Sequence, residues 1–249
     1  MSKKNFYKST PIFLAFLCMG FGDAVGPFVG LAKDTFELST FAATLIQFIG
    51  FTMFLLLSIP MGIVQDRTSR KGVLRLGLLI ALIGLLIPIF KGLESYSLFL
   101  ITIMFLGGGA AILQVSGNPI MRDVSPDGKF ARNLTLGQFI KAIGSLSGPI
   151  IPVVAARWFG VDWSIIFPIY SVALLITLAW ISFVKVEEKK EKGNQPASFK
   201  SSFKLLNNRF VALMVLGIFM YVGAEQCMSS GIPLLLSEKY GIDIQSLGV

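Results

Sequence analysis

The sequence predicts an all-α, polytopic membrane helical bundle, and three observations support this fold class. Hydrophobic residues make up 54% of the 249 residues, charged residues only 14%, and the mean hydropathy is +0.74. A soluble domain of this length has too little interior to bury so much apolar surface. The apolar residues also form long runs, each bounded by charged or turn-forming residues. Because a helix satisfies its backbone polar groups without water, each run is expected to be a helix.

Seven runs are long enough to cross a bilayer, whose hydrocarbon core needs about 20 apolar residues per helix. They cover residues 11–31, 43–64, 72–90, 97–117, 134–156, 165–184 and 210–236. The first run follows a lysine-rich N-terminus, as in a signal peptide. No small-x-small cleavage site follows it, and the run contains Asp23. We therefore expect an uncleaved first span.

The basic residues predict the orientation. Seventeen of the 22 lysines and arginines lie in the N-terminal tail and in the connections after the second, fourth and sixth spans. The other connections hold four, and Lys141 lies within a span. Cytoplasmic connections carry the excess of Lys and Arg. The N-terminus is therefore expected in the cytoplasm, in a multi-pass protein of the cell inner (plasma) membrane.

The longest connection divides the chain into three parts. Residues 185–209 are polar and charged and contain Pro196, which predicts a cytoplasmic linker. Residues 1–184 then form a six-helix bundle, and residues 210–249 hold the first helix of a second bundle. A bundle with one helix beyond a central linker looks incomplete, so we expect the first part of a longer, monomeric protein.

Two spans share a pattern that predicts an internal repeat. The first span has glycines around Asp23 and ends in Pro27; the fourth has glycines before Gln114 and ends in Pro119. Inverted repeats of three helices with polar groups near the membrane midplane are typical of secondary transporters. The alternative is that the glycines only allow close helix packing.

Three ionisable residues lie within predicted spans: Asp23, Lys141 and Glu225. A charge at the centre of a bilayer costs at least about 2.5–3.5 kcal/mol, so it normally faces a wet cavity or an opposite charge. One hypothesis is a salt bridge between Asp23 and Lys141 that locks two helices together. The other is that Asp23 takes up and releases a coupling proton. The two hypotheses are compatible.

Polar residues recur at helical spacing on three spans, which places them on shared faces. They are Gln114 and Asn118 in the fourth span, Gln138, Lys141 and Ser145 in the fifth, and Glu225 and Ser229 in the seventh. Such faces can converge on a central cavity that binds a polar solute. Sugars suit this lining, because amides and carboxylates offer paired contacts to adjacent hydroxyls. The alternative is that these side chains only join neighbouring helices.

The connection after the second span carries a motif. It runs from Gly62 through Asp66, Arg67 and Arg70 to Lys71 and resembles the G-x-x-x-D-R-x-x-R-[RK] signature of the major facilitator superfamily. The resemblance implies a cytoplasmic gate, in which Gly62 permits close helix packing and Asp66 anchors charges and helix ends. The alternative is a basic cytoplasmic loop with an incidental Asp–Arg pair.

Further motifs resemble the fucose/glucose/galactose:proton symporter branch of that superfamily. They are Asp23 before Pro27, Gln114-x-x-x-Asn118-Pro119, Gly137-Gln138 and Tyr221-Val-Gly-Ala-Glu225. The resemblance implies proton-coupled sugar uptake, with Asp23 as a coupling carboxylate and the fourth- and fifth-span residues in contact with sugar.

Two positions depart from the fucose-transporting members of the branch. Those members have a glutamate at the position of Gln114 and an amide at the position of Lys141. Because Gln114 cannot carry a proton, coupling is expected to run through Asp23, together with Glu225. Lys141 either balances Asp23 or recruits an anionic solute such as an acidic sugar.

Other functions fit the sequence less well. Gly144-x-x-x-Gly148-Pro149 resembles a motif of drug antiporters, but those efflux proteins have an arginine where this chain has Ile103. A solute sensor that does not transport is a further alternative. The chain has no histidine and no paired carboxylates on one span, so neither an enzyme nor a metal site is expected.

The expected protein is therefore a proton-coupled symporter of a sugar or sugar-like solute. It needs no cofactor beyond the proton gradient, and sodium is the alternative coupling ion. Its partners are the solute and membrane lipid. Nucleic acid is not expected, because the basic residues form no continuous stripe.

Overall fold

A computed structural model describes residues 3–188 and 198–241, and within these ranges the chain forms helices and no strand. The α-helices are α1 (Lys3–Asp23), α2 (Val25–Thr35), α3 (Thr40–Arg67), α4 (Arg70–Lys91), α5 (Tyr96–Val124), α6 (Phe130–Val154), α7 (Ile166–Phe183), α8 (Phe199–Lys204) and α9 (Arg209–Tyr240). A π-helical turn at Ala155–Phe159 and a 3₁₀ turn at Trp163–Ile165 join α6 to α7, and a 3₁₀ turn at Leu205–Asn207 precedes α9.

Among the described residues, six helices are long and apolar enough to cross a membrane. A seventh span is present if α1 and α2 count as one bent segment. The prediction of an all-α, polytopic membrane fold is confirmed. Of the predicted linker, residues 189–197 lie outside the described residues, and residues after them form α8 and the turn before α9.

The first span is not the continuous helix that the run 11–31 suggested. It breaks between Asp23 and Val25, and the axis of the second part is bent by 48° from that of the first. Proline has no backbone N–H, so Pro27 cannot donate a helical hydrogen bond to the carbonyl of Asp23, four residues earlier. The break therefore places a carboxylate at the end of α1, within the span.

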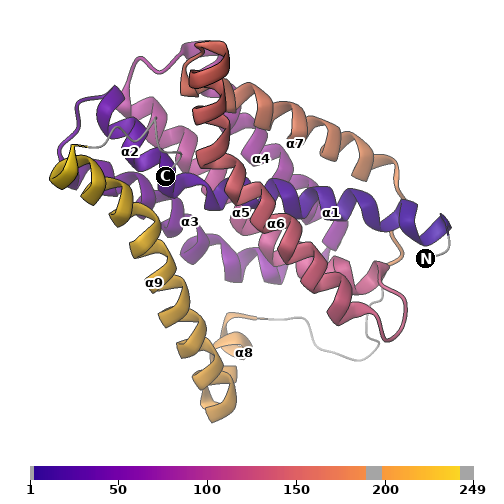
Figure 1. Ribbon diagram of the computed structural model, residues 1–249. Helices are drawn as coiled ribbons and strands as arrows, with labels where there is room; N and C mark the ends of the chain where they lie inside the picture. The colour runs from indigo at the N-terminus through magenta and orange to yellow at the C-terminus, as the bar shows by residue number, and fades with distance from the viewer. Residues whose placement is uncertain (1–2, 189–197, 242–249) are drawn as a thin grey trace.

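The helices pack around α5, which contacts α1, α3, α4 and α6. α6 lies along α1, and α7 packs on α4 and α1. α9 lies at the outside of this bundle, where one end contacts α2 and α3 while the other diverges from the bundle (Figure 1). The N-terminus, the α5–α6 connection and the end of α7 lie at the same end of the bundle (Figure 1).

Glycines set the close contact between α1 and α6. A Cβ atom added at Gly144 would lie 2.2 Å from the carbonyl oxygen of Leu17, and one at Gly20 would lie 2.2 Å from that of Lys141. Only glycine permits this approach of two backbones, as in small-xxx-small helix pairs. The packing explains why both ends of Gly144-x-x-x-Gly148 are glycine. A Cβ atom at Gly148 would lie 2.6 Å from Cβ of Ala24, the residue between α1 and α2.

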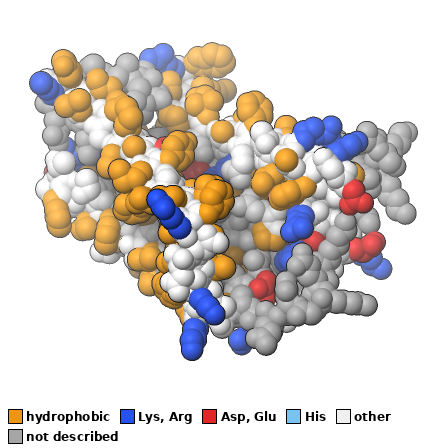
Figure 2. Space-filling model, turned by 90° about the horizontal axis from the view of Figure 1, so that it is seen from below, with side chains coloured by type: hydrophobic (Ala, Val, Ile, Leu, Met, Phe, Trp, Pro, Cys, Tyr) orange, Lys and Arg blue, Asp and Glu red, His pale blue; other side chains and the backbone are white. Residues whose placement is uncertain are grey.

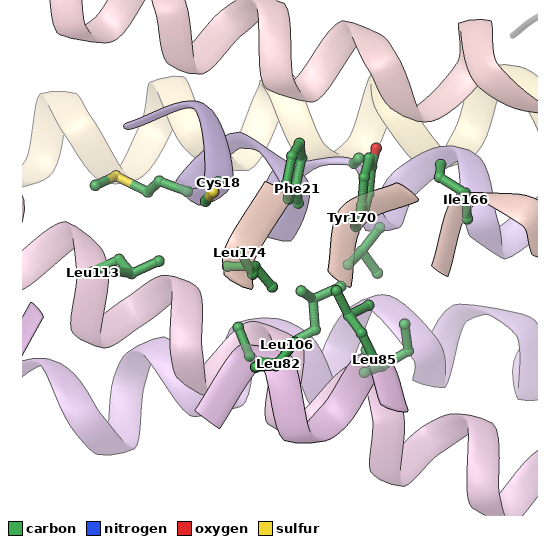
Figure 3. Packing of buried hydrophobic residues seen from close by; sticks show 14 of the residues in the cluster. Cys18, Phe21, Leu82, Leu85, Leu106, Leu113, Ile166, Tyr170 and Leu174 are labelled. Carbon is green, nitrogen blue, oxygen red and sulfur yellow. The ribbon is translucent and has the colours of Figure 1, made fainter. Parts of the chain in front are cut away.

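Aromatic side chains fill the core between the first span and α7. The rings of Phe21 and Tyr170 stack with centroids 3.7 Å apart. Figure 3 shows these two side chains side by side between their helices. Towards the end of α2, Phe28 and Phe167 pack around Trp163, whose indole N–H donates to the hydroxyl of Thr35 at 3.1 Å. These contacts hold α1, α2 and α7 together.

The outer surface is apolar over much of its area. Large side chains such as Phe48 and Leu55 on α3 are 67% and 79% exposed. On the face shown in Figure 2, hydrophobic side chains are spread widely over the described surface, and most of the acidic side chains lie towards one end. Such a surface is stable against lipid rather than water. The chain is a multi-pass membrane protein.

Candidate functional site

A cavity of about 600 Å³ lies between α1, α6 and α9. Its lining is rich in polar and ionisable side chains, in contrast to the surrounding helix surfaces. The polar and charged members are Asp23, Gln138, Lys141, Ser145, Tyr221, Glu225, Gln226 and Ser229. Two of the three polar faces expected from helical spacing, those of the fifth and seventh spans, therefore meet here.

An ion pair crosses the cavity wall from α1 to α6. The ammonium nitrogen of Lys141 lies 2.8 Å from Oδ2 of Asp23, and the hydroxyl of Ser145 donates to the same oxygen at 3.4 Å. The side chains of Asp23 and Lys141 are 25% and 17% exposed, so water in the cavity reaches both. The salt bridge considered from the sequence is thus present, and it faces a cavity.

The polar residues of the fourth span stand behind this pair. Lys141 also donates to Oε1 of Gln114 at 3.1 Å, and the amide of Gln138 donates to Oδ1 of Asn118 at 3.4 Å. Neither Gln114 nor Asn118 is among the residues that line the cavity. In this conformation they position Lys141 and Gln138, and their predicted contact with solute stays a prediction.

Glu225 enters the cavity from α9. Its side chain is exposed, and none of the described residues forms an ion pair or a hydrogen bond with it. One turn later, Ser229 packs against α2 so closely that a Cβ atom at Gly26 would lie 2.0 Å from its hydroxyl oxygen. Gly26 thus allows α9 to approach the first span beside Glu225.

An amide pair that sequence reasoning missed joins α3 to α9. The side chain of Gln47 is 9% exposed and donates to Oε1 of Gln226 at 2.8 Å and to its backbone carbonyl at 3.2 Å. An amide in the apolar run 43–64 was the available signal. Nothing in the sequence spacing indicated its partner, 179 residues later.

The residues of the Gly62–Lys71 motif lie around the connection between α3 and α4. Arg70 donates to both carboxylate oxygens of Asp123 at 2.8 Å, which ties α4 to α5. Asp66 and Arg67 are exposed at the end of α3. The carboxylate that holds Arg70 is therefore that of Asp123 and not that of Asp66. Asp123 had no role in the sequence-based prediction, which named Asp66, Arg67 and Arg70.

Among the described residues, no helix packs closely on Gly62, and its predicted part in the gate stays a prediction. A Cβ atom there would meet only Cγ1 of Val115, at an ordinary 3.9 Å. α3 approaches α5 closely elsewhere, where a Cβ atom at Gly107 would lie 2.6 Å from the carbonyl oxygen of Gly50. The crossing point of the two helices therefore lies more than two turns from Gly62.

Glu188 caps the beginning of α4. Its carboxylate accepts the hydroxyl of Ser69 at 2.7 Å and the backbone N–H groups of Arg70 and Lys71 at 3.0 Å each. Burial would raise the pKa of Glu188, but these hydrogen bonds and the charge of Arg70 hold the pKa below its ordinary value. The positive end of a helix favours such an anion.

The ammonium of Lys71 completes this connection. It donates to the carbonyl oxygens of Ser182 and Val184, at 3.1 and 2.7 Å, at the end of α7. The chain between α7 and the linker is therefore fastened to the start of α4. Sequence reasoning assigned residues 185–209 to a cytoplasmic linker and missed this role of Glu188.

Comparison with known proteins supports the fold and the family. The chain is 31% identical to a glucose/galactose transporter of Brucella abortus over 252 residues, which covers 95% of this chain and 60% of that protein. It is 28% identical to a putative glucose/galactose transporter of Helicobacter pylori, covering 86% and 56%. With an L-fucose-proton symporter of Escherichia coli it shares 27% identity over 46% of this chain and 26% of that protein.

Among solved structures, the fold is similar to a bacterial homologue of the human lysosomal transporter Spinster in an inward-facing, unoccupied conformation. The TM-score is 0.71 at 17% identity, over all of this chain and 58% of that one. The chain spans about 60% of the length of the glucose/galactose transporter of Brucella abortus. Residues 12–249 match the Major Facilitator Superfamily. The family resemblance found in the Gly62–Lys71 motif is thus confirmed, and the chain belongs to the Major Facilitator Superfamily, with sugar transporters among its relatives.

Proposed function

We propose that this protein is a secondary active transporter that takes up a sugar or sugar-like solute by proton-coupled symport. The observation that carries the proposal is the cavity between α1, α6 and α9, which gathers carboxylates, amides and an ammonium group within a membrane bundle. Its volume of about 600 Å³ falls in the range of small-molecule sites. Polar groups near the middle of a repeat-built bundle are where secondary transporters bind solute.

The lining supports a polyhydroxylated solute. Gln138, Ser145 and Ser229 offer donors and acceptors from two sides of the cavity, and Tyr221 adds an aromatic ring with a hydroxyl group. A sugar presents hydroxyls that match such groups and an apolar ring face that packs on aromatic side chains. The similarity to glucose/galactose transporters supports the same class of solute.

Proton coupling is supported by the carboxylates of the cavity. Asp23 and Glu225 can each exist with or without a proton, whereas Gln114 cannot. The proton gradient is then the driving force, and the site requires no organic cofactor. Sodium is the competing ion, because carboxylate oxygens also bind hard cations.

The same proposal places the protein in the inner membrane with a cytoplasmic N-terminus. The basic connections support this orientation. The Arg70–Asp123 pair and the Glu188 cap then lie at the cytoplasmic end, where the motif residues Gly62, Asp66, Arg67 and Arg70 would act as a gate. The Gln47–Gln226 pair joins α3 to α9 beside the cavity, which Gln226 also lines.

Uptake by the full-length protein in liposomes tests the proposal. Radiolabelled D-glucose and D-galactose should accumulate when the outside is more acidic, and adding sugar should alkalinise a weakly buffered medium. Gln138→Ala should reduce the apparent affinity about tenfold, as expected for loss of a hydrogen bond of about 1.4 kcal/mol. Phe139→Ala, on the exposed side of the same helix, is the matched control.

Three results would contradict the proposal. Sugar binding without uptake would favour a sensor. Sugar-dependent acidification of the medium would favour efflux by proton exchange. Accumulation that requires sodium and does not depend on the pH gradient would show that sodium, and not the proton, is the coupling ion.

A further inference from the structure

We propose that Glu225, rather than Asp23, is the carboxylate that loads the coupling proton. The inference rests on the proposed function and narrows it to one group. Two carboxylates face the cavity, and the structure gives them different surroundings. The difference lies in what already neutralises each charge.

The carboxylate of Asp23 is already paired with a positively charged side chain. The Lys141 ammonium lies 2.8 Å away, and the Ser145 hydroxyl donates to the same oxygen. A proton that bound Asp23 would remove the counter-charge of Lys141 and leave the ammonium with the neutral oxygen of Gln114. Breaking a partly buried ion pair on one side is costly, because the remaining charge stays desolvated.

The carboxylate of Glu225 has no such partner among the described residues. The charged groups that face it from the neighbouring helices are Asp23 on α1 and Lys141 on α6, which neutralise one another. Its own helix contributes Tyr221, Gln226 and Ser229 to the cavity lining, and no basic side chain. Among the described residues that line the cavity, one negative charge is therefore uncompensated, and it belongs to Glu225. A proton at that position makes the cavity neutral, which lowers the cost of holding it inside a membrane.

The neighbours of Glu225 link its protonation to helix movement. The next residue, Gln226, is hydrogen-bonded to Gln47 of α3, and Ser229 packs against Gly26 of α2. α9 has no other close backbone approach to the bundle among the described glycines. When α9 moves, Glu225 leaves the cavity surface, whereas Asp23 and Lys141 stay together on α1 and α6. A proton on Glu225 can therefore be taken up from one side of the membrane and released to the other when α9 moves.

Two readouts of the full-length protein in lipid test the inference. The first is the infrared band of protonated carboxyl groups in difference spectra between acidic and neutral pH, which requires no sugar. Glu225→Gln should remove the band assigned to the cavity. The double variant Asp23→Asn/Lys141→Gln, which keeps the pair neutral overall, should retain it. Loss of the band in the double variant and its persistence in Glu225→Gln would overturn the proposal.

The second readout separates coupling from sugar movement. With D-galactose in liposomes, Glu225→Gln should lose gradient-driven accumulation at least tenfold while exchange of labelled for unlabelled sugar continues. Glu225→Asp should restore the response to the pH gradient. Accumulation by Glu225→Gln equal to that of the natural chain would refute the inference alone. Absence of any galactose or glucose exchange in the natural chain would instead refute the proposed function, and the infrared result would still decide the role of Glu225.

Discussion

The contact between α1 and α6 predicts that Gly144→Ala destabilises the bundle although alanine is the better helix former. The added Cβ atom would lie 2.2 Å from the Leu17 carbonyl oxygen and 3.2 Å from Cα of Gly20, whereas ordinary contact begins near 3.4 Å. Both atoms belong to backbone, so no side chain can rotate away. The two helices must therefore separate by about 1 Å.

The magnitude follows from two opposing effects. Overpacking of a well-packed interior costs about 1–3 kcal/mol. Alanine in place of glycine inside a helix contributes about 0.5–1 kcal/mol in the other direction. Gly50→Ala is the matched control, because its Cβ atom would meet Ile103 at an ordinary 3.5 Å. The control should be neutral or slightly stabilising, so the two variants should differ by about 1–3 kcal/mol.

The chain provides its own reporter of unfolding. Cys18 is buried on α1, 3% exposed, and its sulfur lies 3.4 Å from the hydroxyl of Thr177 on α7. In a Cys227→Ser background, a thiol-reactive dye should label Cys18 only after the bundle opens. At about 2–4 °C per kcal/mol, Gly144→Ala should unfold several degrees below Gly50→Ala. Equal midpoints for the two variants would refute the reasoning from backbone contact.

Three further perturbations test other contacts by the same thermal assay. Glu188→Gln should cost about 1 kcal/mol near pH 7. The folded pKa of Glu188 lies below its ordinary value, so this contribution to stability is complete above about pH 4.3 and disappears as the pH falls through the folded pKa. A stability difference between Glu188→Gln and the natural chain that stays the same in strong acid would contradict this reasoning. Gln47→Ala and Gln226→Ala should show a coupling energy of about 0.5–1.5 kcal/mol in a double-mutant cycle, and strictly additive effects would exclude the amide pair. Asp23→Asn should cost about 1–2 kcal/mol, an intermediate value because its partner Lys141 is 17% exposed, and adding Lys141→Gln should recover part of that loss rather than increase it.

The sequence was sufficient to predict the spans, because the bilayer imposes a length and a composition on each helix. The run 72–90, for example, corresponds to α4, whose bounds are Arg70–Lys91. The break of the first span could also have been predicted, since Pro27 denies a hydrogen bond to Asp23. The apolar composition of the run concealed it, because a hydropathy pattern records burial in lipid and not the continuity of the backbone.

Side-chain partners from distant segments were beyond the sequence. Helical spacing showed that Gln138 and Lys141 share a face, but the rotation of α6 depends on its contact with Gly20 of α1. The same limit explains why Asp123 and Glu188 were missed at the motif end. An acidic residue in a connection is usually solvated, and only the tertiary fold brings these two carboxylates to Arg70 and Lys71.

For the proposed transport, the packing favours movement at one particular interface. α1 and α6 approach at Gly20 and Gly144, and α3 and α5 at Gly50 and Gly107, so each pair holds its backbones in direct contact. Separating such a pair would expose backbone and small residues that have no side chain to rearrange. α9, in contrast, packs on α2 and α3 along one end, and its described polar contacts there are the Gln47–Gln226 amide pair and the approach of Ser229 to Gly26. The cavity lies along the interface between α9 and the bundle, so we expect a movement of α9 to open or close the site that contains Glu225 and the Asp23–Lys141 pair.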